Sequence, residues 1–163
     1  MSERPTAQAL RAAFDAAFTS PPADPRPAEV PLLVLRVGTA RVAVRALETG
    51  GLVAPGRIEP VPSRRRELLG VAGLRGTLLP VYGLARLLGI DDAGETPRWL
   101  LLAGGAAGVG LAFGALEAYR RVPEAALEVA SGATGALREL VRVEAGALPV
   151  VSMPALLREI GLS

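Results

Sequence analysis

From Leu32 onward, the chain is divided into short apolar segments, about ten residues apart, that end at glycine-containing turns. The segment LLVLRV is followed by the turn Gly38-Thr39-Ala40 and then by RVAVRAL, in which apolar and charged side chains alternate. A period of two places successive side chains on opposite faces of a strand. Short strands at this spacing, with few helices between them, predict an all-β barrel or sandwich.

The strand-like segments fall into two regions of similar length, about 30–90 and about 98–155. This division leaves two arrangements open, namely two small interlocked barrels or one larger barrel. The segment after them, about 154–161, carries Leu156, Leu157 and Ile160 on one side. It is expected to form an amphipathic closing helix.

The longest uncharged segment, Trp99–Leu116, has 18 residues, which is the lower limit for a membrane-spanning helix. It contains five glycines, and beyond its GGAAG cluster apolar residues alternate with glycine and alanine. This pattern predicts a strand, a glycine turn and a second strand instead. Charged residues interrupt the first 18 positions, so no secretory signal is expected. We therefore expect a soluble cytoplasmic protein without direct membrane insertion.

The first 29 residues differ in character from the rest. Residues 6–19 place Leu10, Phe14 and Phe18 four positions apart, which predicts a short amphipathic helix. The following SPPADPRPAEVP is a proline-rich tether. The favoured interpretation is a helix that packs on its own domain, and the alternative is a docking peptide carried on the tether.

The chain contains neither histidine nor cysteine. Their absence removes the commonest general base, the thiolate nucleophiles and the usual metal ligands. The adjacent acids Asp91 and Asp92 are typical of an exposed turn. We therefore expect no enzymatic activity, no cofactor and no metal. All 18 basic residues are arginine, which is typical of a GC-rich bacterial genome, and the net charge of +2 is too small to predict a nucleic-acid surface.

Arg75 is the one charged residue in the apolar stretch Leu68–Leu84. Gly73 and Gly76 flank the Leu74-Arg75 pair and favour a tight turn. In one interpretation the guanidinium reaches water while its stem covers neighbouring leucines. In the other, the turn presents Arg75 at the rim of a surface groove, where its planar fork bonds carboxylates or carbonyls in a partner. A buried Arg75 would need an internal acid.

The stretch LLGVAGLRGTLLPVYGLARLLGI resembles the central signature of the CheW-like coupling-domain family, Gly-Val-x-Asn-Leu-Arg-Gly followed by Pro-Val-x-Asp-Leu. The residues in register are Gly70-Val71, Leu74-Arg75-Gly76, Pro80-Val81 and Leu84. The flanking segments LLVLRVGTARVAV, IEPVP, AAGVGLAFGAL and ALPVVSMPALLREIG resemble other parts of the family pattern in the same order. The resemblance thus covers most of residues 30–163.

The resemblance implies two five-stranded β-barrels around a shared core, which we expect at about 30–90 and 98–155. Members of the family are adaptors, not enzymes. They join the cytoplasmic domain of methyl-accepting chemoreceptors to the regulatory domain of a CheA-type histidine kinase, and another CheW-like protein is a further expected partner. The receptor helix is expected in a groove between the barrels. The residues expected to face it are Leu74, Arg75, Gly76, Leu79, Val81 and Val53.

The chain departs from the family pattern where Gly73 stands for the family's asparagine and Gly83 and Gly114 each stand for an aspartate. The family acid that pairs with the motif arginine aligns near Gly51, and Glu48 is the nearest acid. This divergence leaves open an accessory coupler that binds the receptor and not the kinase, as in frizzy-type pathways of gliding bacteria.

Two alternatives come from other classes of protein. A small-ligand-binding barrel would need polar and aromatic residues to orient its ligand, and the chain has few of these. A nucleic-acid-binding barrel would use Arg57 and Arg64 to Arg66, but the aromatic platform on which bases stack is missing. A coupling protein therefore remains the favoured interpretation.

Overall fold

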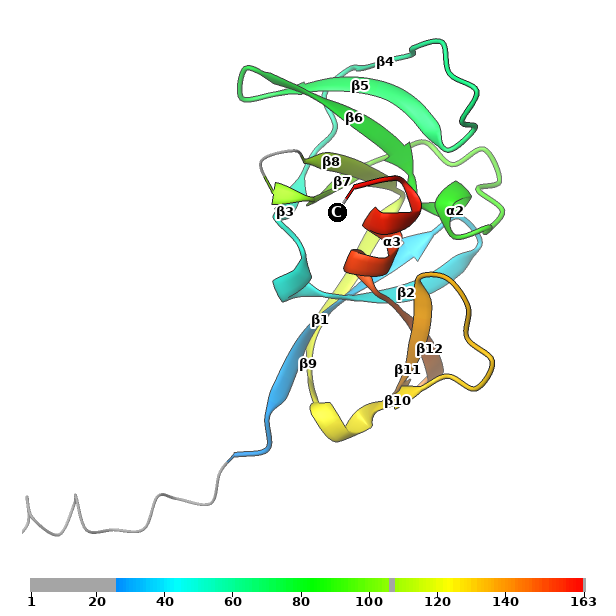
Figure 1. Cartoon of the computed structure of the whole chain (residues 1–163). Helices are drawn as coiled ribbons and strands as arrows, with labels where there is room; N and C mark the ends of the chain where they lie inside the picture. Colours follow the sequence, from blue (N-terminus) through cyan, green and yellow to red (C-terminus); the bar gives the residue numbers. More distant parts are fainter. Residues whose placement is uncertain (1–25, 106–107, 163) are drawn as a thin grey trace, which may run out of the picture.

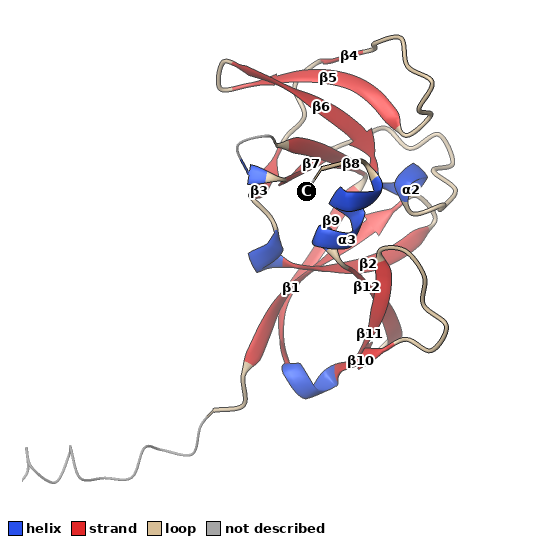
Figure 2. Cartoon of the chain, in the orientation of Figure 1, coloured by secondary structure: helices blue, strands red, loops and turns tan. Residues whose placement is uncertain are grey.

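The computed structural model describes residues 26–105 and 108–162, which form two six-stranded β-sheets and a few short helices (Figures 1 and 2). The all-β prediction is confirmed. The helix expected over residues 6–19 and most of the proline-rich tether lie outside the described residues. In the described part of the chain, no helix has the length and apolar character needed to cross a membrane.

The first sheet has the strand order β10-β11-β12-β2-β1-β9. Its strands are β1 (Glu29–Val37), β2 (Ala40–Arg45), β9 (Ala115–Pro123), β10 (Leu127–Val129), β11 (Leu137–Val143) and β12 (Gly146–Val151). Strands β12 and β2 run parallel, with Val150 opposite Ala43, and the other pairs are antiparallel. The end strands β9 and β10 follow one another along the chain through the short helix η3 (Glu124–Ala126). The sheet therefore curls into a barrel-like unit (Figure 1).

The second sheet has the order β3-β7-β8-β6-β5-β4. Its strands are β3 (Gly51–Val53), β4 (Ile58–Glu59), β5 (Leu68–Leu74), β6 (Thr77–Gly83), β7 (Trp99–Ala103) and β8 (Val109–Phe113). Strands β6 and β8 are the parallel pair, and here too the end strands β3 and β4 are consecutive in the chain. The strand pair predicted within Trp99–Leu116 is confirmed, because Trp99 lies opposite Phe113 in an antiparallel hairpin.

Both sheets follow one plan, in which two antiparallel hairpins are joined by parallel pairing of their second strands. The segments Leu79-Pro80-Val81 in β6 and Leu148-Pro149-Val150 in β12 occupy equivalent places. Each of these strands runs into a helix, α2 (Leu84–Leu87) after β6 and α3 (Met153–Glu159) after β12. The two barrel-like units thus repeat one structural theme.

The two sheets do not coincide with the contiguous regions 30–90 and 98–155. Strands β1 and β2 belong with β9 to β12, while β3 to β8 form the other sheet. The physical reason is the parallel pairing of β12 with β2, which brings the C-terminal hairpin back to the first one. Each sheet has six strands where five were expected, because strands of only two or three residues, such as β4 and β10, add to the edges.

The largest cluster of buried side chains lies between the two sheets and includes Leu35, Leu101 and Phe113. Helix α3 adds Met153 and Leu156, both fully buried, to this cluster. The closing helix predicted near 154–161 is therefore present, from Met153 to Glu159. No polar or charged side chain is buried in residues 26–105 and 108–162, so apolar burial is the main force that joins the two units.

Candidate functional site

Arg75 and Gly76 are the two turn residues of the β5–β6 hairpin, whose flanking residues Leu74 and Thr77 pair directly. Their φ angles are +48° and +82°. Positive φ at both central positions is the geometry of a type I′ turn, which suits the twist of a hairpin. Glycine adopts this conformation freely, whereas a residue with a Cβ is strained there by about 1–2 kcal/mol. The backbone is therefore strained at Arg75, whose side chain the turn projects beyond the sheet.

A surface groove of about 540 Å³ opens beside this hairpin. Strand β6 pairs with β8 only from Val81 onward, so the tip of the hairpin extends past the start of β8 (Figure 1). The groove is lined on the hairpin side by Leu74, Arg75, Thr77, Leu78, Leu79 and Pro80, and on the other side by Gly50, Leu102, Ala103, Gly105, Gly108 and Val109. Arg75 is the one charged residue in this described lining. The groove is thus apolar with a cation at its rim.

Three of the six residues predicted to face a receptor groove lie on this one, namely Leu74, Arg75 and Leu79. Gly76 lies in the exposed turn outside the lining. Val81 has no exposed surface, because it packs within the small core of the second sheet, and therefore it cannot contact a partner. Val53 packs against the small core of the second sheet. The groove also differs in position from the expectation, since its lining strands all belong to the second sheet and do not lie between the two units.

Among the groove residues that the sequence interpretation missed, Leu78 is the exposed large hydrophobic one. Its side chain is 75% exposed, which is unusual for a leucine in a strand. It lies opposite Gly73, so both residues are on the same face and the glycine leaves that face open. Consecutive strand residues point to opposite faces, so Leu78 and Leu79 could not both enter the core. The alternation of side chains along a strand could therefore have identified Leu78 as exposed from the sequence alone.

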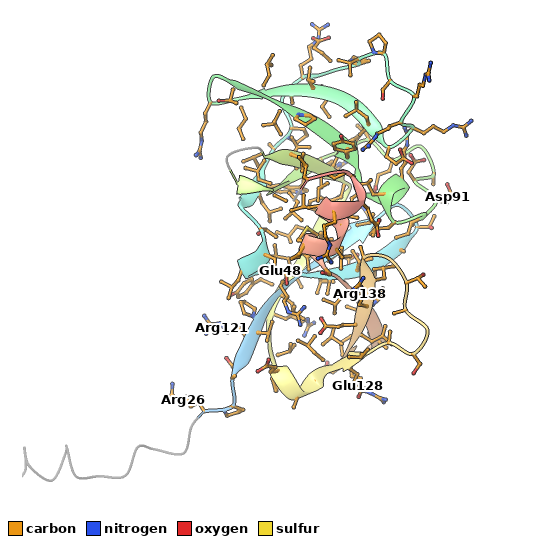
Figure 3. All side chains as sticks on the ribbon, viewed as in Figure 1. Arg26, Glu48, Asp91, Arg121, Glu128 and Arg138 are labelled. Carbon is orange, nitrogen blue, oxygen red and sulfur yellow. The ribbon has the colours of Figure 1, made fainter. Side chains whose placement is uncertain are left out.

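Glu48, the acid nearest to the position expected to pair with Arg75, is engaged elsewhere (Figure 3). Its Oε2 accepts a hydrogen bond of 3.0 Å from the backbone N–H of Met153, at the start of α3. Its Oε1 lies 3.8 Å from Arg45, which bonds Glu139 at 2.5 Å. The hydrogen bond that Arg45 donates to Glu139 raises the pKa of Arg45 above its ordinary value. Within the described residues Arg75 forms no ion pair, so its guanidinium is available to a partner.

The loop 91–97 supplies carboxylates near two of the positions where glycine replaces a family acid. Glu95 lies against Gly114, and Glu95 and Gly83 line one small cleft. The Glu95 Oε2 accepts a hydrogen bond of 2.9 Å from the backbone N–H of Gly38, which fixes the loop to the β1–β2 turn. Asp92 accepts one of 2.9 Å from Arg86, and this bond lowers the pKa of the Asp92 carboxyl.

We expect Gly114→Asp, which restores the family residue, to lower the free energy of unfolding by about 2 kcal/mol. A Cβ at this position would overlap the Glu95 carboxylate, which would have to leave the Gly38 N–H. A hydrogen bond to a charged group contributes about 1.5–3 kcal/mol. Urea unfolding measures the loss. In a cycle with Glu95→Ala, the double variant should be no less stable than Glu95→Ala alone, and additive losses would contradict this explanation.

The chain resembles known proteins both in its sequence pattern and in its fold. A family model described as the CheW-like domain matches residues 31–161. The crystal structure of the scaffolding protein TtCheW from Thermoanaerobacter tengcongensis is similar with a TM-score of 0.69 at 15% identity, over 77% of this chain and 90% of that chain. None of the curated proteins matches the chain. The structural likeness supports the fold, and the family model covers most of the described chain.

Proposed function

The chain belongs to the CheW-like domain family, and on that premise we propose that it couples the cytoplasmic domain of a chemoreceptor to a CheA-type histidine kinase in bacterial chemosensory signalling. Proteins of this family are non-enzymatic scaffolds. The lack of histidine and cysteine agrees with a role in binding and not in chemistry. The protein acts in the cytoplasm, where it holds receptor and kinase in one assembly through preformed surfaces.

The observation that carries the proposal is the apolar groove with Arg75 at its rim. Helix-in-groove recognition uses apolar residues three or four positions apart on the ligand helix, set into an apolar channel. Leu78 of the hairpin and Leu102 of β7 supply such a channel, and Leu79 contributes to its lining although its side chain is largely buried. A carboxylate on the helix would bond the planar guanidinium of Arg75. The strain that Arg75 carries in its turn favours a role in binding, because folding alone would prefer glycine or asparagine there.

Calorimetric titration with a receptor cytoplasmic fragment tests the proposal. We expect Leu78→Ser and Arg75→Asn each to raise the Kd by about tenfold or more, because exposed apolar and arginine side chains are typical anchors of an interface. Asn-Gly is a favoured type I′ pair, so Arg75→Asn removes the guanidinium and keeps the hairpin. Leu47→Ser is the matched control, because Leu47 is 85% exposed but does not line the groove. A wild-type protein that fails to bind, or groove variants that bind as well as it does, would overturn the proposal.

A parallel titration with the regulatory domain of the kinase separates the two kinds of coupler. Binding to both partners identifies a full coupler. Binding to the receptor fragment alone identifies an accessory coupler, and assigns the loss of the kinase surface to the divergence of this chain. Gly83 and Gly114 are not sufficient grounds for that loss, because the Glu95 carboxylate lies against Gly114, and Asp92 and Glu95 line the same cleft as Gly83.

A further inference from the structure

The groove beside the β5–β6 hairpin and the segment 6–19 are two apolar surfaces carried by one chain. In the groove, the Leu78 side chain is 75% exposed. For residues 6–19, outside the described part of the chain, the sequence predicts an amphipathic helix with Leu10, Phe14 and Phe18 as its apolar stripe. A helix of fourteen residues is marginal by itself in water. This segment therefore needs a surface on which to fold.

The chain itself limits how far the groove lies from the start of β1. Leu32 of β1 is paired with Arg45 of β2, and Gly50 in the groove lining follows Arg45 by five residues. Part of that connection is the compact helix η1 (Ala46–Glu48). Extended residues advance by about 3.4 Å and paired Cα atoms lie about 5 Å apart, so Glu29 is at most about 30 Å from Gly50.

The proline-rich tether covers this distance. Ten residue steps separate Thr19 from Glu29, and four of the positions between them are proline, which favours the polyproline II conformation. Such a chain advances by about 3.1 Å per residue, so the tether spans about 31 Å. In Figure 1, η1 and β3 lie along one side of the view, between the start of β1 and the tip of the β5–β6 hairpin. The tether therefore has the length to bring residues 6–19 to the groove.

The charges of the segment and of the groove are complementary. Asp15 is the one acid in residues 6–19, and it flanks the apolar stripe. Arg75 is the one charged residue in the described groove lining, and it forms no ion pair with another described residue. A carboxylate and a guanidinium bond strongly and in a fixed geometry. Arg11 lies one helical turn before Asp15, but an exposed pair within a helix is weak and does not hold the carboxylate away from Arg75.

We propose that residues 6–19 fold back as a helix onto the groove of their own chain. The apolar stripe packs on Leu78 and Leu102. Asp15 bonds Arg75 at the rim. The tether makes the contact intramolecular, so a weak contact is enough to occupy the groove for much of the time. The segment then competes with a receptor helix and regulates coupling; this competition rests on the proposed function, whereas the docking does not.

A disulfide between introduced cysteines tests the docking in the full chain, which contains no cysteine of its own. Ala17 lies on the side of the apolar stripe, and Thr77 lines the groove. A disulfide forms only where the two Cα atoms come within about 7 Å. With oxidised glutathione, we expect Ala17→Cys/Thr77→Cys to form an intramolecular disulfide at least about tenfold faster than Ala17→Cys/Val129→Cys. Phe14→Ser, added to the first pair, should abolish this difference.

Val129 is the matched control position because the tether can reach it equally well. It is 83% exposed and lies in the first sheet, away from the groove. It follows Pro123, the pairing partner of Glu29, by only six residues. A difference in rate between the two cysteine pairs therefore reports docking and not the reach of the tether.

Titration with the receptor cytoplasmic fragment tests the competition. We expect Phe14→Ser to lower the Kd by about threefold, as for a groove that the segment occupies two-thirds of the time. Ala12→Ser, on the opposite side of the predicted helix, should leave the Kd unchanged. In a Leu78→Ser background Phe14→Ser should have no effect, because the groove has already lost the segment. The loss of affinity caused by Leu78→Ser is therefore larger beside Phe14→Ser than in the wild type.

Several outcomes would overturn the inference. Equal disulfide rates at Thr77 and Val129 exclude the docking. Disulfides that join two chains place the segment on a second copy and exclude the intramolecular contact. A Phe14→Ser variant that binds the receptor as the wild type does excludes the competition. A receptor fragment that binds no variant contradicts the proposed function, while the disulfide rates still decide the docking. Thermal unfolding of each variant checks that the fold is unchanged.

Discussion

Leu156→Ala is expected to lower the free energy of unfolding by about 3 kcal/mol. Leu156 is fully buried and belongs to the cluster that joins the two sheets. Truncation of a buried leucine removes apolar contacts and leaves a cavity, at a cost of about 2–5 kcal/mol. The surrounding side chains come from separate strands and helices, which limits how far the site can collapse. Urea unfolding at equilibrium, followed by circular dichroism, measures the change.

Leu157→Ala is the matched control for this prediction. Leu157 is the next residue of the same helix and is only half-buried, so the helix loses the same side chain with less apolar surface removed from the core. Its effect should be less than half that of Leu156→Ala. Equal effects would mean that the loss comes from helix α3 itself and that Leu156 does not connect the two units.

The periodicity of apolar residues predicted the strands and helices whose formation depends on neighbouring residues. The hairpin in Trp99–Leu116 and helix α3 both follow from periodicity, since alternation and a helical apolar stripe are properties of neighbouring residues. The assignment of the strands to the two sheets could not be predicted in this way, and the two contiguous regions were wrong. The parallel pairing of Val150 and Val151 with Ala43 and Val44 joins segments more than a hundred residues apart, and no residue of either strand encodes that choice locally.

Half of the residues predicted for the candidate site lie on the groove, because the site also depends on contacts between distant segments. Leu74, Arg75 and Leu79 lie on the groove because the tip of the hairpin extends beyond its neighbour. Val81 points to the same face as Leu79, but it lies two residues further along β6 and packs fully within the small core of the second sheet. Only the three-dimensional structure shows this difference. The bonds of Glu48 to α3 and of Glu95 to the β1–β2 turn also join distant segments. The spacing of residues in the sequence does not predict these hydrogen bonds.

Gly70→Ala is expected to destabilise the second sheet by about 3 kcal/mol or more. Gly70 has a φ of +153° and lies where the register of β5 shifts against β6. The backbone of Glu59 passes so close that a Cβ at Gly70 would overlap its carbonyl oxygen. Backbone atoms cannot rotate aside as a side chain does, so strand β4 would have to move away. Overpacking of this kind costs about 1–3 kcal/mol, and the strained φ adds to it.

Gly73→Ala, in the same strand, separates this steric cause from a general intolerance of β5 to substitution. A Cβ at Gly73 meets nothing within 4 Å, and its φ is not positive, so we expect a change of less than about 0.5 kcal/mol. Chemical unfolding of both variants gives the comparison, and similar losses would contradict the steric explanation. Gly70 lies in β5, the strand that leads into the turn with Arg75. We therefore expect Gly70 to affect receptor binding only through the stability of the fold. Gly70→Ala should therefore weaken receptor binding only to the extent that it unfolds the protein.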